Sequence, residues 1–226
     1  MTVNEIFYSL QGEGSLVGVP SVFVRLAGCP LRCRWCDTKY AWSASAGTEY
    51  TIEEVAEKVE SYRTNHLIIT GGEPMTNPEL PDMLKTISGG NLHITIETCG
   101  IKFVPDLSCD LMSISPKLAN STPTESELAL EHEKIRFDLP SLQQLIDNYR
   151  YQLKFVVDGP DDIEEIEMTL ANLKNVNRDR VFLMPQAGTL DEYLAKSKMT
   201  AELCKQTGFR FSPRLQVFLW NNAGGR

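Results

Sequence analysis

The sequence predicts an α/β protein built as a partial (β/α)6 barrel, a truncated and open relative of the TIM barrel. Three observations lead to this fold class. Six short apolar runs indicate buried strands, helical patterns separate several of them, and each run ends in a polar or glycine- and proline-rich turn. Because eight such units are needed to close a complete barrel, six predict an open one.

The first elements lie in the N-terminal quarter of the chain. Residues 2–8 predict a short edge strand, and residues 21–27 predict the first strand of the barrel. Thr51, followed by Glu54, matches a capping box at the start of a helix. The apolar residues of that helix fall on one face: Ile52, Val55, Ala56, Val59 and Tyr62.

The rest of the chain alternates expected strands and helices. Strands are expected at 66–70, 92–97, 111–114, 151–157 and 180–184, and helices at about 78–87, 140–149, 161–173 and 189–206. We expect one domain over residues 1–226. The polar segment at about 117–137 predicts a long loop or irregular insertion, and the glycine-rich end, residues 221–226, predicts a short flexible tail.

Composition narrows the possible partners. The net charge is −8 and the sequence pI is near 5.0, which argues against a nucleic-acid or anionic-membrane surface, since both require a concentrated basic face. No apolar run approaches the roughly 20 residues that span a bilayer, and the N-terminus lacks a basic segment followed by an apolar one. We therefore expect a cytoplasmic protein that acts on small molecules or other proteins.

Three of the six cysteines predict a metal site. Cys29, Cys33 and Cys36 form a Cys-x-x-x-Cys-x-x-Cys arrangement directly after the strand expected at 21–27. A structural zinc site normally has four ligands, whereas an iron–sulfur protein can leave one iron of its cluster without a protein ligand. Three local cysteines without a local histidine favour such an open cluster. The remaining cysteines, Cys99, Cys109 and Cys204, are interpreted as small buried hydrophobic residues.

A second motif, Gly71-Gly72-Glu73-Pro74, follows the next expected strand. The glycine pair lets a ligand approach the backbone, and the carboxylate of Glu73 can accept hydrogen bonds from an ammonium group. Further polar motifs follow other strands, and the ends of parallel strands converge on one rim of a barrel. They are Glu97-Thr98, Ser115-Pro116-Lys117 and Met184-Pro185-Gln186.

Together, the cysteine motif and the Gly-Gly-Glu-Pro motif resemble those of the radical S-adenosylmethionine (radical SAM) enzymes, with Trp35 at the aromatic position before the last cysteine. The resemblance implies the partial barrel of the radical SAM type. It also implies a [4Fe–4S] cluster on Cys29, Cys33 and Cys36, with S-adenosylmethionine bound at the iron that no cysteine holds.

The flanking residues are similar to one family within this superfamily, the 7-carboxy-7-deazaguanine synthases. The similarity is carried by residues 10–14, 23–26, 36–38, 69–74 and 115–117 and by Arg214-Leu-Gln-Val-Phe-Leu-Trp220. It implies conversion of 6-carboxy-5,6,7,8-tetrahydropterin into 7-carboxy-7-deazaguanine with loss of ammonia, in the biosynthesis of queuosine and related 7-deazapurines. It also implies Mg²⁺, a homodimer, and a reductant such as flavodoxin or ferredoxin.

The resemblance assigns site residues, although no protein acid or base is among them. Thr38 is expected to bind Mg²⁺, which usually takes few protein oxygens, and Arg25 suits a substrate carboxylate because its planar fork can bind both oxygens. The residues expected to bind S-adenosylmethionine are Gly72, Glu73, Ser115, Pro116, Lys117 and Gln186. Those expected to bind the pterin are Leu10, Gln11, Gly12, Glu13, Arg25 and Thr70.

Two other functions share parts of this pattern. A radical SAM activase of a glycyl-radical enzyme would carry the same cysteine and Gly-Gly-Glu-Pro motifs, and a zinc-binding interaction module would need only the cysteines. The segment Gln11-Gly12-Glu13 and Thr38 favour the pterin enzyme.

Overall fold

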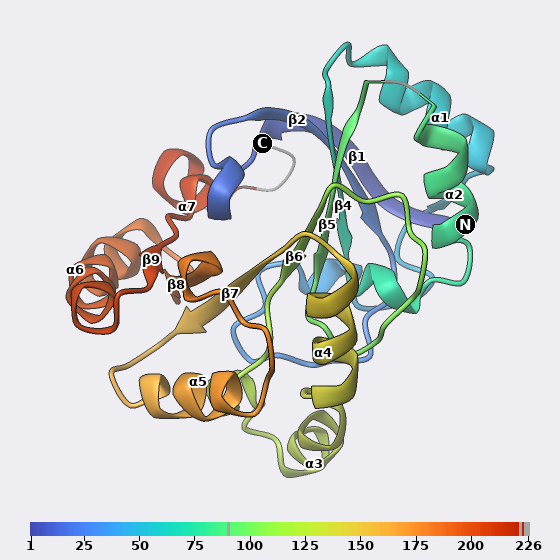
Figure 1. Ribbon diagram of the computed structural model, residues 1–226. Helices are drawn as coiled ribbons and strands as arrows, with labels where there is room; N and C mark the ends of the chain where they lie inside the picture. The colour runs from blue at the N-terminus through green and yellow to red at the C-terminus, as the bar shows by residue number, and fades with distance from the viewer. Residues whose placement is uncertain (90, 222, 224–226) are drawn as a thin grey trace.

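A single nine-stranded sheet forms the centre of the computed structural model, which describes residues 1–89, 91–221 and 223 (Figure 1). The strand order is β3-β1-β2-β4-β5-β6-β7-β8-β9. The strands are β1 (Thr2–Leu10), β2 (Pro20–Leu26), β3 (Thr48–Glu49), β4 (His66–Gly71), β5 (His93–Thr98), β6 (Leu111–Ile114), β7 (Tyr151–Val157), β8 (Val181–Pro185) and β9 (Arg210–Phe211).

The six expected barrel strands are confirmed as β2 and β4 to β8, each parallel to the next. The N-terminal strand differs from the expectation in two ways. β1 runs to Leu10, because its antiparallel pairing with β2 continues to the pair of Leu10 and Pro20, and β3 rather than β1 lies at the edge. β3 and β9 have two residues each, too few for a periodic pattern to reveal.

The two faces of the barrel strands have different neighbours. On β2, Val22, Val24 and Leu26 are buried in the main hydrophobic core, together with Val55 and Leu80 from the helices outside the sheet. Phe23 and Arg25 alternate with them and line a cavity on the inner face. Figure 1 shows helices α1, α2 and α4 on the outer side of the sheet.

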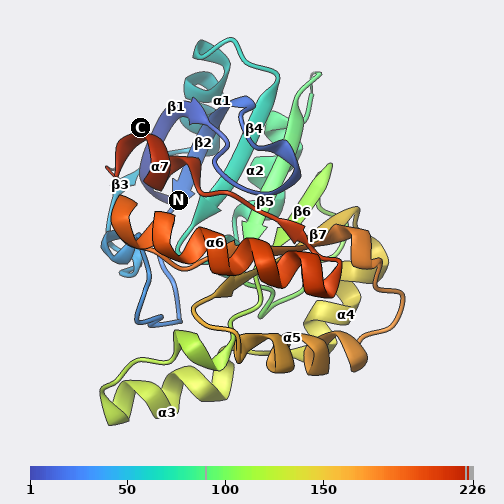
Figure 2. The ribbon, with the colours of Figure 1, turned by 90° about the vertical axis from the view of Figure 1, so that its left-hand side faces the viewer.

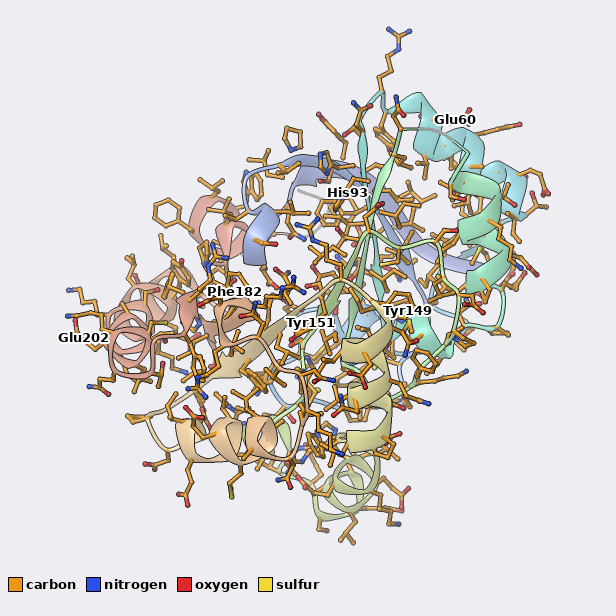
Figure 3. All side chains as sticks on the ribbon, viewed as in Figure 1. Glu60, His93, Tyr149, Tyr151, Phe182 and Glu202 are labelled. Carbon is orange, nitrogen blue, oxygen red and sulfur yellow. The ribbon has the colours of Figure 1, made fainter. Side chains whose placement is uncertain are left out.

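The expected helices are present with shifts of one or two residues at their ends. The capping box of Thr51 and Glu54 is formed, and Thr189 and Glu192 form a second one. The α-helices are α1 (Ile52–Ser61), α2 (Leu80–Ile87), α3 (Ser126–Ile135), α4 (Leu139–Asn148), α5 (Asp162–Ala171), α6 (Leu190–Thr207) and α7 (Leu215–Trp220). Glu60 on α1 and Glu202 on α6 point outward from the periphery, where part of the acidic charge lies (Figure 3).

Two helices were not expected from the sequence. The segment 117–137 contains α3, so the expectation of a loop or irregular insertion was wrong for residues 126–135. Leu128 and Leu130 on α3 are exposed, so its apolar residues do not mark a buried stripe, and the helix stands out below the sheet (Figure 2). α7 is six residues long. Of the expected flexible tail, residues 222 and 224–226 lie outside the described part of the chain.

Within the described residues, no helix combines the length and apolar character needed to cross a membrane.

Candidate active site

The polar motifs at the ends of the parallel strands meet around one cavity of about 300 Å³. Of the sixteen residues that the sequence assigns to the site, fourteen line this cavity: Leu10, Gln11, Gly12, Glu13, Arg25, Cys29, Cys33, Cys36, Thr38, Thr70, Gly72, Glu73, Ser115 and Lys117. Pro116 and Gln186 are not among the lining residues, and Gln186 instead accepts a hydrogen bond from Lys196 Nζ at 2.6 Å. The expectation that the strand-end motifs converge is therefore met for most of them.

Backbone hydrogen bonds hold the cysteine loop in place. Gly28 N donates to Ala41 O at 2.9 Å, and Cys29 N donates to Trp42 O at 3.0 Å. Within the loop, Cys36 N donates to Cys33 O at 3.1 Å. The loop is thus fixed at both the first and the last of its cysteines.

The insertion at 117–137 packs against the other side of this loop. Arg34 N donates to Ser121 O at 2.8 Å, and Arg32 N donates to Nδ1 of the buried His132 at 3.3 Å. The Nε2 atom of His132 lies 2.9 Å from Ser121 Oγ. α3 therefore supplies a histidine that positions the cysteine loop from outside.

The three cysteines of the loop lie at the same cavity. Cys29, Cys33 and Cys36 are all free and all line the cavity. Among the described residues, no three His, Cys, Asp or Glu side chains gather closely enough to hold one metal ion. In an iron–sulfur cluster each thiolate binds a different iron. Burial raises the pKa of Cys29 to about 12 and that of Cys33 to about 11, so metal binding would have to displace their protons.

The Gly-Gly-Glu-Pro motif is joined directly to the cysteine loop. Gly72 N donates to Leu26 O at 2.9 Å, and Glu73 N donates to Gly28 O at 2.9 Å. A Cβ atom at Gly72 would stand 2.1 Å from Gly28 O, so only glycine allows this approach. The buried Glu73 accepts from Thr98 Oγ1 at 2.6 Å and from Cys99 N at 2.7 Å. Cys99, interpreted from the sequence as a buried hydrophobic residue, is buried and also lines the cavity.

A buried lysine on β7 forms the polar floor of the cavity. Lys154 is 1% exposed, and its Nζ donates to Glu13 Oε2 at 2.9 Å and to Glu97 Oε2 at 2.7 Å. Gln11 Nε2 donates to the other oxygen of Glu97 at 3.0 Å. Sequence reasoning did not single out Lys154. The available signal was a lysine between Leu153 and Phe155 in a strand whose only other strongly polar residue is Gln152, where an unpaired charge would be costly to bury.

The lysine and Glu13 stabilise each other's charged form. Burial alone would raise the pKa of Glu13, but the charges of Lys154 and Arg214 outweigh it and lower that pKa to about 2. Burial would likewise lower the pKa of Lys154, yet the two carboxylates raise it. Glu13 and Lys154 therefore both carry charge at neutral pH.

The lowered pKa of Glu13 predicts how acid affects stability. Its usual value is 4.5, so between pH 4.5 and about 2 the unfolded chain binds a proton at Glu13 that the folded protein does not. The stabilisation from Glu13 is present above pH 4.5 and is lost as the pH falls toward 2. Urea unfolding from pH 6 to pH 3 should therefore show a flatter decline for Glu13→Gln than for the wild type. Glu127→Gln, at an exposed site on α3, is the control. Equal slopes for wild type and Glu13→Gln would contradict the assignment.

Arg25 lies in the cavity wall but already has a carboxylate partner. Its Nε donates to Glu5 Oε1 at 2.7 Å, and its guanidinium lies 5.8 Å from the ring centre of Phe7 and 5.9 Å from that of Tyr40. The bond to Glu5 uses only the Nε atom of the Arg25 guanidinium. Within the described residues, no hydrogen bond is found for its two terminal nitrogens. Arg25 can therefore offer those two donors to a ligand.

Thr38 faces the same cavity from the end of the cysteine loop. Its Oγ1 lies 3.6 Å from Cys36 Sγ, and it precedes a short 3-10 helix without capping it through its side chain. The side chain of Thr38 therefore does not cap this turn.

None of the three histidines, all of which the structure describes, lines the cavity. His66 and His93 begin β4 and β5 with ring centres 5.1 Å apart, and Figure 3 shows His93 far from the helices at the lower end of the molecule.

The fold and this cavity define a radical SAM protein. Residues 24–118, which include the cysteine loop and the Gly-Gly-Glu-Pro motif, match the model of the radical SAM superfamily. Membership of this superfamily implies a [4Fe–4S] cluster and S-adenosylmethionine.

Comparison with known proteins narrows the class. A 7-carboxy-7-deazaguanine synthase from Halobacterium salinarum is 41% identical over 99% of this chain and 91% of its own length. A 7-carboxy-7-deazaguanine synthase from Rhodopirellula baltica is 36% identical over 100% of this chain and 88% of its own length. The crystal structure of QueE from Escherichia coli superposes with a TM-score of 0.71 at 27% identity, over 93% of this chain and 92% of that one. The chain belongs to the 7-carboxy-7-deazaguanine synthase family, and neither the activase nor the zinc-module alternative is favoured.

Proposed function

We propose that this protein converts 6-carboxy-5,6,7,8-tetrahydropterin into 7-carboxy-7-deazaguanine and ammonia, in the biosynthesis of queuosine and related 7-deazapurines. Family membership supports the reaction. The observation that carries it is that one cavity joins three free thiols to an ion-paired polar floor made by Glu13, Glu97 and Lys154. An activase of a large protein substrate would have no evident need for this floor. The proposal includes a single domain, which the one continuous sheet supports.

The thiols and the Gly-Gly-Glu-Pro turn would hold the cofactors. Cys29, Cys33 and Cys36 would bind the [4Fe–4S] cluster, which together with S-adenosylmethionine supplies the one-electron chemistry when bound. The residues proposed to orient S-adenosylmethionine and to exclude water are Gly72, Glu73, Ser115, Pro116, Lys117 and Gln186. Support is strongest for those that line the cavity and weakest for Pro116 and Gln186, which do not.

The pterin would lie between the N-terminal turn and the inner faces of β2 and β4. Charge and hydrogen-bonding capacity support this placement, because Glu13 and Gln11 offer groups for the amide and amine edge of a pterin and Arg25 offers free donors for its carboxylate. The proposed set is Leu10, Gln11, Gly12, Glu13, Arg25 and Thr70, all on the cavity wall. These residues bind and orient the substrate, and no acid or base is assigned among them.

We further propose that Thr38 binds Mg²⁺, together with oxygens of the substrate. Thr38 lines the cavity, and Mg²⁺ commonly combines few protein ligands with substrate or water oxygens. Thr38→Ala should raise the Mg²⁺ concentration needed for half-maximal activity by about tenfold, as expected for loss of an oriented ligand of ~1.4 kcal/mol. Thr86→Ala, on the exposed side of α2, should leave it unchanged. An identical Mg²⁺ response in Thr38→Ala would remove Thr38 from the metal site.

We also propose an oligomeric state, an electron donor and a cellular compartment for this protein. The family resemblance supports a homodimer and a flavodoxin or ferredoxin as electron donor, and six free thiols suit a reducing, cytoplasmic setting. Sedimentation of the reconstituted protein tests the dimer.

Turnover under anaerobic conditions tests the proposed function. The reconstituted protein is incubated with dithionite, S-adenosylmethionine, Mg²⁺ and 6-carboxytetrahydropterin, and the products are identified by mass. We expect 7-carboxy-7-deazaguanine. Failure to form it, combined with a stable complex between this protein and a glycyl-radical enzyme, would support the activase instead.

A further inference from the structure

The C-terminal segment holds the turn that carries the proposed pterin ligands. Leu215 N donates to Gly12 O at 3.0 Å, and Gln216 Nε2 donates to Glu13 Oε1 at 2.7 Å. A Cβ atom at Gly12 would stand 2.1 Å from Gln216 Oε1, so the two segments are in close contact. About 200 residues separate them in the sequence. The position of the turn therefore depends on the C-terminal segment.

Arg214, in the same segment, reaches toward the cysteine loop. It is 7% exposed and lines the cavity. One terminal nitrogen donates to Asp37 Oδ2 at 2.6 Å and the other donates to Ala187 O, while its Nε lies 3.6 Å from Glu13 Oε1. The guanidinium thus contacts both the cysteine loop and the pterin-binding turn.

The position of Asp37 gives this ion pair its importance. Asp37 stands between Cys36, a proposed cluster ligand, and Thr38, the proposed Mg²⁺ ligand. A guanidinium is planar and its donors have fixed directions, so a buried arginine bound on several sides sets distances that a flexible cation would not. The side chain of Arg214 is 8% exposed and that of Asp37 33% exposed, so solvent screens this contact only in part.

We propose that Arg214 is a positioning residue that, through Asp37, sets the place of Cys36 and Thr38 relative to the pterin-binding turn at 11–13. This inference rests on the proposed function and extends it, because it names the connection that aligns the two halves of the site. Chemistry between a substrate and a cofactor depends on such alignment, and displacement by about 1 Å can cost about a hundredfold in rate.

Amide hydrogen exchange tests the connection without relying on turnover. In Asp37→Asn, which keeps the size of the side chain and removes its charge, exchange should become faster in peptides covering 34–41 and also in those covering 11–18. The matched control is Glu167→Gln, which weakens the ion pair of Arg178 with Glu167. The side chain of Glu167 is 41% exposed, and neither residue of this pair lines the cavity. Exchange that rises only around residue 37 would overturn the proposal.

Kinetics of the reconstituted enzyme provide the second readout. Asp37→Asn should raise KM for the pterin by about tenfold and should lower the yield of 7-carboxy-7-deazaguanine per 5′-deoxyadenosine formed. Arg214→Met should do the same, and the double variant should be no worse than Arg214→Met alone, because both changes break one connection. A purely structural ion pair would lower the unfolding temperature without changing this yield, and that outcome would refute the positioning role.

The two tests separate failure of the inference from failure of the proposed function. If the wild type forms no deazaguanine while exchange at 11–18 responds to Asp37→Asn, the connection stands and the proposed reaction is wrong. If the wild type forms the product and neither readout responds, the reaction stands and the positioning role is wrong.

Discussion

Cys33→Ala is expected to abolish formation of 7-carboxy-7-deazaguanine. Cys33 is buried at the wall of the cavity, and with Cys29 and Cys36 it forms the group of thiols proposed to hold the cluster. Removal of one of three thiolates leaves a cluster with two protein ligands, which should be lost or left unable to bind S-adenosylmethionine productively. Iron and sulfide content after anaerobic reconstitution should fall together with activity.

The control for this substitution is Cys109→Ala. Cys109 is also a free thiol, partly buried against the main core, but it does not line the cavity. It should retain iron, sulfide and activity. Turnover by Cys33→Ala at the wild-type rate would contradict the assignment of the cluster, and about one zinc with no iron in the wild type would return the zinc module to consideration.

Lys154→Met is expected to be the most destabilising substitution at the site. It would leave Glu13 and Glu97 close together, partly buried and without the cation that both contact. Breaking a buried ion pair by removing one partner costs about 3–5 kcal/mol, and urea unfolding measures this loss. Activity should also fall sharply, because Glu13 and Gln11 would no longer be held in place. Lys198→Met, at an exposed position on α6, should change the free energy of unfolding little.

A double substitution separates the charge effect from loss of packing. Glu97→Gln removes one of the two negative charges, so Lys154→Met with Glu97→Gln should recover part of the stability lost in Lys154→Met. If the double variant is less stable than Lys154→Met by the full cost of Glu97→Gln, the two residues act independently and the buried triad has been misjudged.

The sequence predicted best those features whose residues lie close together in the chain. The six parallel strands were predictable because each is a short, largely apolar run followed by a turn, and the ends of parallel strands must share one rim. The cysteine loop and the Gly-Gly-Glu-Pro turn were recognisable because each contains its functional residues within a few positions of one another.

The parts that were missed depend on partners distant in the sequence. A lysine on a strand usually faces solvent, and nothing near Lys154 shows that its partners come from residues 13 and 97. Arg214 likewise becomes informative only when the fold brings it to Asp37. α3 lacks a buried apolar stripe, so its role was visible only through the contact of His132 with the cysteine loop.

The yield of ammonia and 7-carboxy-7-deazaguanine in one anaerobic incubation tests the central claim most directly. With reconstituted protein, dithionite, S-adenosylmethionine, Mg²⁺ and 6-carboxytetrahydropterin, we predict one ammonia for each deazaguanine, and neither when S-adenosylmethionine is omitted. Protein that contains its full iron and sulfide, cleaves S-adenosylmethionine and yet releases neither compound would contradict the claim that this cavity carries out the ring contraction.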